Sequence, residues 1–208
     1  MVYNMKINVI FYSLYGHIYQ MAEAAAAGAR EVEGAEVELF QVQETFTEEI
    51  LEKMGATEAK RSFAHIPVAT VDKLAEADGI IFGVPTRFGM IPSQMQAFID
   101  RTGGLWSKGG LVNKVGSIFT SAATQHGGQE STILGFSTVL FHHGMVIVGI
   151  PYTYPGISVQ DEVSGGGPYG ASAVVGNGVG RPPTKNELDI VRFQGKHVAE
   201  ITRKLVGE

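Results

Sequence analysis

Cysteine is absent from this chain of 208 residues. The absence excludes a disulfide framework, a thiolate metal site and a cysteine nucleophile, so redox chemistry would need a borrowed cofactor. Clusters of lysine and arginine are also lacking, and the net charge is −5. We therefore expect no nucleic-acid or anionic-membrane surface. The histidine pair at 142–143 has no partners at metal-ligand spacing, so no metal site is expected.

Long apolar runs are missing as well. The run at 145–150 is far shorter than the roughly 18 residues that a membrane helix requires. The first residues lack the small-residue cleavage site of a secretory signal. The sequence thus predicts a soluble cytoplasmic protein. Glycine, by contrast, is abundant at 27 residues, which is nearly twice its ordinary share and marks loops with unusual backbone conformations.

Short runs rich in β-branched residues alternate with segments of helical spacing along the chain. This pattern is typical of an α/β fold with an open, doubly wound parallel sheet and helices on both faces. Five strands are predicted at 6–12, 36–43, 79–84, 115–121 and 145–150. Helices are predicted at 18–32, 71–77, 93–102, 129–143 and 184–205.

Side-chain patterns refine two of these helices. Capping boxes are expected for Ser93 with Gln96 and for Thr184 with Glu187. In the helix at 129–143, the residues predicted to face inward are Ile133, Leu134, Ser137, Leu140 and Phe141.

The length favours a single domain over residues 1–208. Two segments interrupt the regular pattern. A polar excursion covers 44–65 and has a weak helical pattern at 47–54, and a Gly/Pro-rich arm covers 151–183. The arm is longer than an ordinary connection inside a domain, so we interpret it as a functional loop or an interface arm.

In such a sheet, ligands bind beyond the carboxyl ends of the strands. The loop at 13–18 joins the first strand directly to a helix, whose free N–H groups favour an anion. It contains neither GxxxxGK[ST] nor GxGxxG, which favours a terminal phosphate over a nucleoside triphosphate. Alternatively, its Ser and Gly are ordinary residues before a helix.

Two further loops follow strands of the predicted sheet. At 85–89, Thr86 could meet the polar edge of a planar heterocycle while Arg87 and Phe88 frame it. Alternatively, Arg87 is a solvated charge and Phe88 a core residue. The loop at 121–128 is small, hydroxylic and glycine-rich, so that a ring could approach its backbone, or it is only a flexible turn.

Several blocks of sequence stand in an order that resembles the WrbA-type NAD(P)H:quinone oxidoreductases, and the likeness spans nearly the whole chain. The blocks are Tyr12-Ser13-Leu14-Tyr15-Gly16-His17-Ile18, Pro85-Thr86-Arg87-Phe88-Gly89, Thr102-Gly103-Gly104-Leu105-Trp106, His126-Gly127-Gly128-Gln129-Glu130, His142-His143-Gly144-Met145 and Pro168-Tyr169-Gly170-Ala171.

The resemblance implies a flavodoxin-like sheet of order 2-1-3-4-5 that binds FMN. It implies two-electron reduction of quinones to hydroquinones at the expense of NADH or NADPH, by ping-pong hydride transfer, in a homotetramer with sites near subunit contacts. A protective role against oxidative stress follows from this chemistry. The alternatives are a flavodoxin-like one-electron carrier and a regulatory protein built on the flavin fold.

The resemblance also implies roles for individual residues. Tyr15 and Trp106 would contact the substrates, and His142 would act as the catalytic residue beside the flavin. Trp106 could instead be a core or interface anchor, and His142 a helix C-cap. The residues implied to bind FMN are Ser13, Leu14, Tyr15, Gly16, His17, Ile18, Pro85, Thr86, Arg87, Phe88, Gly89, Ser121, Ala122, Ala123, Thr124, Gln125, His126, Gly127 and His142.

Overall fold

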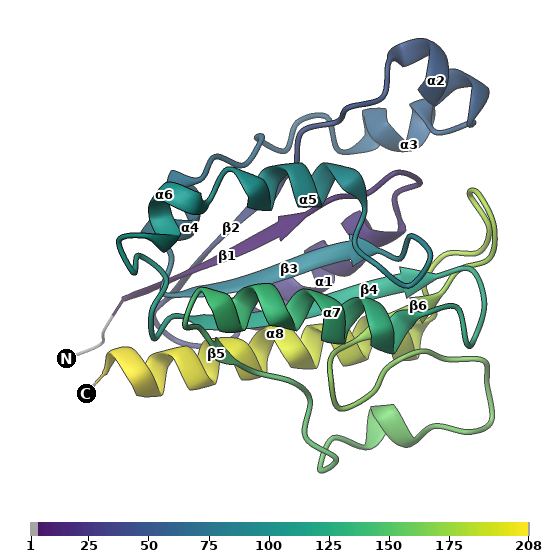
Figure 1. Ribbon diagram of the computed structural model, residues 1–208. Coiled ribbons are helices and arrows are strands. Elements are labelled where there is room, and N and C mark those ends of the chain that lie inside the picture. Colours follow the sequence, from purple (N-terminus) through teal and green to yellow (C-terminus); the bar gives the residue numbers. More distant parts are fainter. Residues whose placement is uncertain (1–3, 208) are drawn as a thin grey trace.

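The computed structural model describes residues 4–207, and its centre is a parallel sheet of order β2-β1-β3-β4-β5 (Figure 1). The predicted fold class and strand order are therefore confirmed. The strands of this path are β1 (Met5–Phe11), β2 (Ala35–Gln41), β3 (Gly79–Pro85), β4 (Val115–Ala122) and β5 (Val146–Ile147). β3 and β4 are buried along nearly their whole length because helices cover both faces of the sheet.

The edge beyond β4 differs from the prediction because two strands share it. β5 pairs with the start of β4, at Val115 and Gly116, and a sixth strand, β6 (Ser172–Val174), pairs with its end. The predicted strand at 145–150 is shorter because the chain leaves β4, and Ile150 N–H donates to Pro168 O. β6 belongs to the arm at 151–183, so part of this arm joins the sheet. The arm also contains the short 3-10 helix η1 (Pro155–Ser158).

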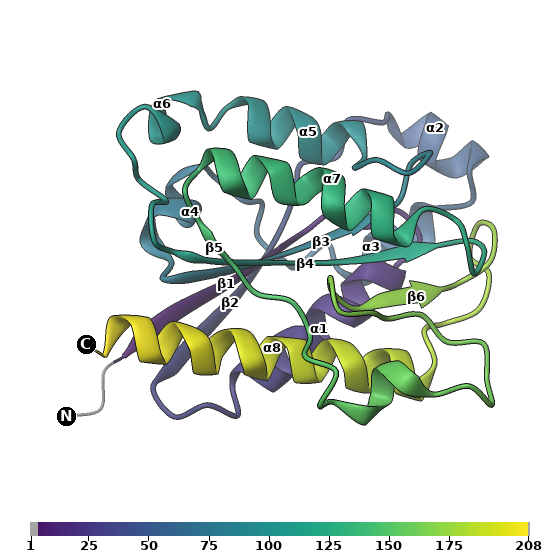
Figure 2. The ribbon, with the colours of Figure 1, turned by 60° about the horizontal axis from the view of Figure 1, so that its bottom comes forward.

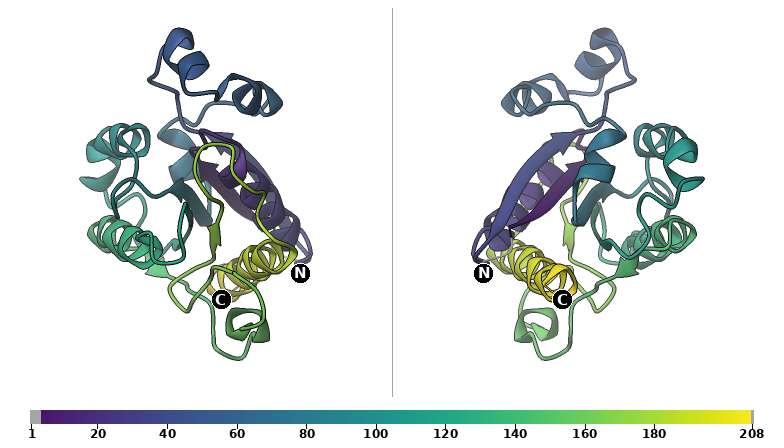
Figure 3. Two further views of the ribbon diagram at one scale, coloured as in Figure 1. Left: turned by 90° about the vertical axis from the view of Figure 1, so that its right-hand side faces the viewer. Right: turned by 90° about the vertical axis from the view of Figure 1, so that its left-hand side faces the viewer.

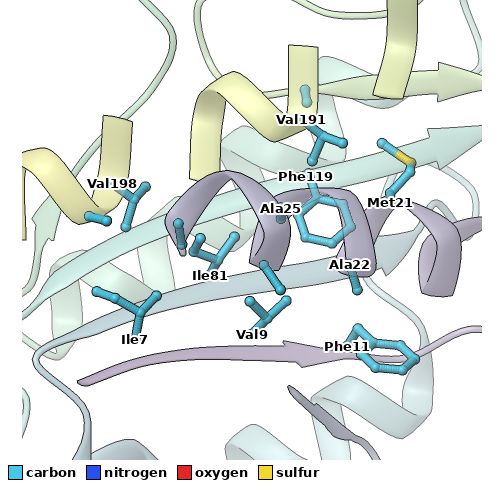
Figure 4. Close-up of a cluster of buried hydrophobic side chains, with 14 of the residues drawn as sticks. Ile7, Val9, Phe11, Met21, Ala22, Ala25, Ile81, Phe119, Val191 and Val198 are labelled. Carbon is cyan, nitrogen blue, oxygen red and sulfur yellow. The ribbon is translucent and has the colours of Figure 1, made fainter. Parts of the chain in front are cut away.

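Helices form a layer on each face of the sheet (Figures 2 and 3). α1 (His17–Ala29) and α8 (Lys185–Val206) cover one face, where Ile7, Val9 and Val198 belong to a buried cluster (Figure 4). The buried cluster on the other face draws mainly on four further helices. These are α4 (Asp72–Glu76), α5 (Ser93–Asp100), α6 (Gly103–Trp106) and α7 (Gln129–His142).

Of the two predicted capping boxes, the one at Thr184 and Glu187 is confirmed. The one at Ser93 is wrong, because the N-cap of α5 is Pro92 and the Ser93 hydroxyl instead donates to Gln94. In α7, Leu134 and Phe141 were expected to face inward, but they are 46% and 67% exposed. Only Ile133, Ser137 and Leu140 of that group are buried, so the inward stripe is narrower than predicted.

The polar excursion contains two short helices, α2 (Glu48–Lys53) and α3 (Thr57–Ser62). α2 corresponds to the weak pattern predicted at 47–54, and Thr47 caps it by accepting from Ile50 N–H. Both helices stand apart from the layers that cover the sheet, beyond the end of β2 (Figures 1 and 3). Among the helices of residues 4–207, none has the length and apolarity needed to cross a membrane.

Candidate functional site

A pocket of about 270 Å³ lies at the carboxyl edge of the sheet, where the chain leaves β1, β3 and β4. We call it the rim pocket. Its volume is near the lower end of small-molecule sites, so part of a larger ligand would remain outside it. No carboxylate is present among the described residues that line it. The lining residues are Ser13, Leu14, Tyr15, His17, Ile18, Pro85, Thr86, Arg87, Ser121, Ala122, Ala123, Thr124, Gly127, Val175, Gly176, Asn177 and Gly178.

The loop between β1 and α1 forms the floor of this pocket. Gly16 is the N-cap of α1 with φ +86°, and its N–H donates to Ser13 Oγ over 3.1 Å. Within residues 4–207, the N–H groups of Leu14, Tyr15, His17 and Ile18 have no acceptor. Helix N-termini carry partial positive charge, and unpaired N–H groups there bind anions. This geometry matches the donor set predicted from the sequence for a terminal phosphate.

A glycine-rich strap closes one side of the pocket, and the sequence reasoning missed it. The strap is residues 175–181, in which Gly176, Gly178 and Gly180 all have positive φ. Its base is fixed, because Val175 N–H donates to Ala122 O and Arg181 N–H donates to Val175 O. The alternation of glycines was a signal for this unusual backbone, but nothing local indicated that the strap would meet α1.

The tip of the strap depends on His17. His17 Nε2 lies 2.6 Å from Val179 O, and no other hydrogen bond involves strap residues 177–180 in the described chain. The imidazole is buried, and this burial lowers its pKa. His17 is therefore the single polar tether between the tip of the strap and the first turn of α1.

The base of the strap is anchored by a buried carboxylate. Glu187 is fully buried at the start of α8 and accepts from both guanidinium nitrogens of Arg181, each at 3.2 Å. It also accepts from the backbone N–H groups of Gly165, Val174 and Thr184. These donors hold the base of the strap rigidly. Among the described residues, the tip of the strap is held only by the contact between His17 and Val179 O.

The loop after β3 places Pro85, Thr86 and Arg87 on the pocket but turns Phe88 away from it. Thr86 N–H already donates to Ser121 O, and Arg87 Nη1 donates to Thr86 O. Phe88 is fully exposed and has φ +53°, so it neither frames a ring in this chain nor fills the core. Gly89, with φ +80°, completes the turn without lining the pocket.

The loop after β4 is divided between two hollows. Ser121 to Thr124 and Gly127 line the rim pocket. Gln125 and His126, predicted to do the same, line a neighbouring hollow with Gly165, Gly166 and Gly167 instead. Both side chains are exposed. The turn around Gly127, whose N–H donates to Thr124 O, directs these two residues away from the pocket.

His142 and Trp106 lie far from the rim pocket of their own chain. α7 begins beside the pocket and ends at His142, and its 14 residues span about 20 Å. There, Trp106 Nε1 donates to His142 O over 2.9 Å. Both line a hollow with the buried His143, whose pKa is lowered by burial and by the neighbouring His142. Within one chain, Trp106 and His142 thus form a separate group at the opposite edge of the sheet, whereas Tyr15, the other predicted substrate residue, lines the rim pocket.

A buried polar cluster lies behind the loop at 13–18. Glu44 accepts from the Tyr12 hydroxyl at 3.1 Å and from Gln94 Nε2 at 3.2 Å, and it pairs with Lys60 at 3.0 Å. Burial raises the pKa of Glu44, but donation from Phe46 N–H and Lys60 outweighs this and holds it below its ordinary value. Burial, together with the Glu44 charge, raises the pKa of Tyr12.

The rim pocket fits the phosphate end of the predicted FMN. The unpaired N–H groups of the floor, the hydroxyls of Ser13 and Thr124, and the absence of lining carboxylates match a phosphate monoester with a polyol chain. Pro85 and Arg87 also line the pocket. The volume of about 270 Å³ accommodates this end and leaves the ring accessible from outside.

Comparisons with known proteins bear on this fit. Residues 5–155 match the family model described as NADPH-dependent FMN reductase. The chain is 62% identical over 202 residues to an NAD(P)H dehydrogenase (quinone) from Geotalea daltonii, covering 97% of this chain and 98% of that protein. It is 56% identical over 208 residues to one from Methanosarcina mazei, covering 98% and 100%.

A solved structure is similar in fold. The flavodoxin, WrbA-like protein from Agrobacterium tumefaciens aligns with a TM-score of 0.64 at 23% identity, covering 97% of this chain and 99% of that one. Flavodoxin 1 from Bacillus cereus aligns with a TM-score of 0.54 at 17% identity, covering 98% of each chain. At these identities the likeness shows the fold alone.

Proposed function

This chain belongs to the NADPH-dependent FMN reductase family, within which it groups with the NAD(P)H dehydrogenases (quinone), and from this premise we propose its reaction. The enzyme reduces quinones to hydroquinones with electrons from NADH or NADPH, and FMN is its cofactor. The observation that carries the proposal is the set of N–H groups at Leu14, Tyr15, His17 and Ile18, which have no acceptor within residues 4–207 and adjoin a pocket whose described lining holds no carboxylate.

Each part of the rim pocket has a task in this proposal. The N–H groups of Leu14, Tyr15, His17 and Ile18 bind the FMN phosphate at the start of α1. The hydroxyls of Ser13 and Thr124 are acceptors and donors for the ribityl chain. Arg87, which also lines the pocket, would supply a cation that favours negative charge on the reduced flavin.

When bound, FMN would supply the two-electron chemistry that couples a nicotinamide to a quinone. Tyr15 lines the pocket and supplies an aromatic wall. A planar nicotinamide and a planar quinone can both stack on such a wall, one after the other. We therefore expect ping-pong kinetics, with each substrate using the same opening.

A homotetramer would complete the site. Trp106, at the end of α6, is 56% exposed, and Phe141, near the end of α7, is 67% exposed. Both exposures are unusual for large apolar side chains. Because the Trp106 indole is fixed on His142 O, these residues form one unit that a neighbouring copy could receive at its rim pocket. In this arrangement, Trp106 and His142 of one subunit would meet the ligands of another.

We further propose that residues 1–208 form one domain that works in the cytoplasm, where two-electron reduction would protect against oxidative stress from quinones. Two observations support the single domain. The sheet receives strands from both halves of the chain, and α1 packs on α8 from the opposite end of the sequence.

The proposal is tested with the purified full chain. We expect FMN to bind with quenching of its fluorescence, and we expect NADH or NADPH oxidation to require both FMN and a benzoquinone. Initial rates at several quinone concentrations should give parallel double-reciprocal lines. Absence of FMN binding, or oxidation of NAD(P)H at the same rate without quinone under anaerobic conditions, would overturn the proposal.

A further inference from the structure

Lys60 extends from α3 of the excursion to the end of β1. Its Nζ lies 3.0 Å from Glu44 Oε2 and donates to Ser13 O over 3.3 Å. It also lies over the rings of Tyr12 and Phe63, at 5.2 and 5.1 Å from their centroids. The side chains of Lys60 and Glu44 are only 13% and 14% exposed. This sequestered cation therefore sits directly behind the loop that forms the floor of the rim pocket.

Glu44 holds Lys60 in one position because it is itself fixed from several sides. It accepts from the Tyr12 hydroxyl, from Gln94 Nε2 and from the N–H groups of Thr45 and Phe46. These donors come from the residue that follows β1, from α5 and from the segment that follows β2. An ion pair with this many hydrogen bonds has little freedom to rearrange. The ammonium group of Lys60 is thus a rigid donor to Ser13.

The hydrogen bond to Ser13 O determines where the next N–H points. The peptide bond between Ser13 and Leu14 is trans, so its C=O and N–H groups point in opposite directions. Lys60 does not line the rim pocket, whereas Ser13 and Leu14 do. With the carbonyl directed back toward Lys60, the Leu14 N–H is directed toward the pocket, where it has no acceptor within residues 4–207.

We propose that Lys60 is a positioning residue that orients the Ser13–Leu14 peptide toward the phosphate of FMN. The inference deepens the proposed function and rests on it. Bare attraction between Lys60 and the phosphate contributes little, because Glu44 neutralises the ammonium at 3.0 Å. Lys60 acts on FMN binding through the Ser13–Leu14 peptide group. The excursion at 44–65 thereby contributes to the rim pocket, although α2 and α3 do not line it.

This role predicts discrimination between FMN and riboflavin. Riboflavin has the same ring and ribityl chain but no phosphate, so a misoriented Leu14 N–H affects it little. Loss of Lys60 should therefore weaken FMN binding selectively. A merely structural role in packing α3 against the sheet would weaken the binding of both flavins, because the whole pocket would be disturbed.

The test uses the full chain, titrated with FMN and separately with riboflavin. In Lys60→Met the donor is lost while most of the aliphatic stem is kept, and Lys60→Arg restores a donor. Arg61→Gln is the matched control, because the adjacent Arg61 is 71% exposed and pairs only with Glu58 among the described residues. The double variant Lys60→Met with Glu44→Gln avoids leaving a buried carboxylate without its cation, in case the single variant folds poorly.

We expect Lys60→Met to raise the Kd for FMN about tenfold, as for the loss of one well-aligned donor to a charged ligand. The Kd for riboflavin should change less than about twofold. Lys60→Arg should recover most of the FMN affinity, Arg61→Gln should match the wild type, and the double variant should show the same selective loss as Lys60→Met.

Equal loss of both flavins in Lys60→Met and the double variant, or no loss of FMN affinity in either, would overturn this inference while leaving the proposed function intact. Failure of the wild-type chain to bind FMN would overturn both. The two failures are therefore distinguishable in the same set of titrations.

Discussion

Two glycines permit a close contact between α1 and α8. A Cβ on Gly195 would lie 2.0 Å from Ala25 O, and one on Gly28 would lie 1.8 Å from Arg192 O. Real side chains do not approach a backbone carbonyl so closely. Neither residue has a positive φ, so it is the lack of a side chain that matters here and not conformational freedom.

We predict that Gly195→Ala lowers the free energy of unfolding by about 2 kcal/mol or more, because the two helices must move apart to admit the methyl group. Urea unfolding would measure the change. Gly104→Ala is the control, since a Cβ there meets nothing within 4 Å and the residue lies in a helix. A loss as large in the control as in Gly195→Ala would contradict this explanation.

The partly buried carboxylate of Glu44 gives a prediction about pH. Its folded-state pKa lies below the ordinary 4.5, although burial alone would raise it, because Phe46 N–H and Lys60 stabilise the charge. A carboxylate with a depressed pKa adds stability above its unfolded pKa and loses it as the pH falls through the folded pKa. We therefore expect the stability advantage of the wild type over Glu44→Gln to be greatest above about pH 4.5 and to shrink below it.

Urea unfolding of both proteins between neutral pH and about pH 3 would measure this advantage. Glu58→Gln is a suitable reference, because its side chain is 85% exposed. An advantage that grows as the pH falls would reverse the expected sign and refute the assignment.

At the scale of the elements, the strap and the helix caps illustrate the effect of single hydrogen bonds. The tip of the strap is held to α1 only through His17 and Val179 O among the described contacts, so its closure depends on one side chain. If FMN binds beneath it, the strap must open before the cofactor leaves.

We predict that His17→Leu releases FMN about fivefold faster than the wild type, since a typical hydrogen bond contributes about 1 kcal/mol. The rise of FMN fluorescence after dilution of the loaded protein would report the rate. His65→Leu is the control, because His65 is exposed and does not line the rim pocket. An unchanged release rate in His17→Leu would show that the strap is not a barrier.

The two Ser/Thr positions expected to cap helices provide a matched pair. Thr184 accepts from Glu187 N–H and begins α8, whereas Ser93 makes no cap at α5. Thr184→Ala should therefore cost about 1 kcal/mol of stability and Ser93→Ala much less. Thermal or urea unfolding of both variants would test the difference, and equal costs would contradict the assigned caps.

At the scale of the whole molecule, the rim pocket and the unit of Trp106 and His142 lie at opposite edges of one sheet. A site shared between two copies of the chain therefore implies that FMN binding and quinone reductase turnover respond differently when the copies dissociate. The proposed phosphate site lies within one chain, but Trp106 and His142 of the same chain do not line the rim pocket.

We predict that dilution below the concentration at which the proposed homotetramer dissociates lowers quinone reductase activity per chain, while FMN stays bound. Sedimentation velocity would give the assembly state, and fluorescence would give FMN occupancy at the same concentrations. Trp106→Ala should reduce turnover with little effect on FMN affinity. Full activity in a monomer would exclude the shared site.

Much of this organisation follows from the sequence. The alternation of β-branched runs and helical segments predicts the parallel sheet, because each strand and helix buries its own local pattern. The loop at 13–18 is equally readable, since its donors, its glycine and the helix that follows are contiguous in the chain. The capping box of α8 is also local, with its two partners three residues apart.

Features that depend on distant segments could not be read this way. β6 was hidden in the arm because its three residues form a strand only where β4 offers an open edge. The strap meets His17 across 162 positions of sequence, and Lys60 meets Ser13 across 47. The separation of His142 from the pocket likewise follows from the length and direction of α7.

The sequence by itself thus determined the sheet and the loop of N–H groups at the start of α1, because neighbouring residues set both through backbone periodicity and a helix start. The tertiary structure alone decided which distant side chains close, brace or stand apart from that loop. The physical reason is that hydrogen bonds and packing act over a few ångströms in space, whatever the distance along the chain.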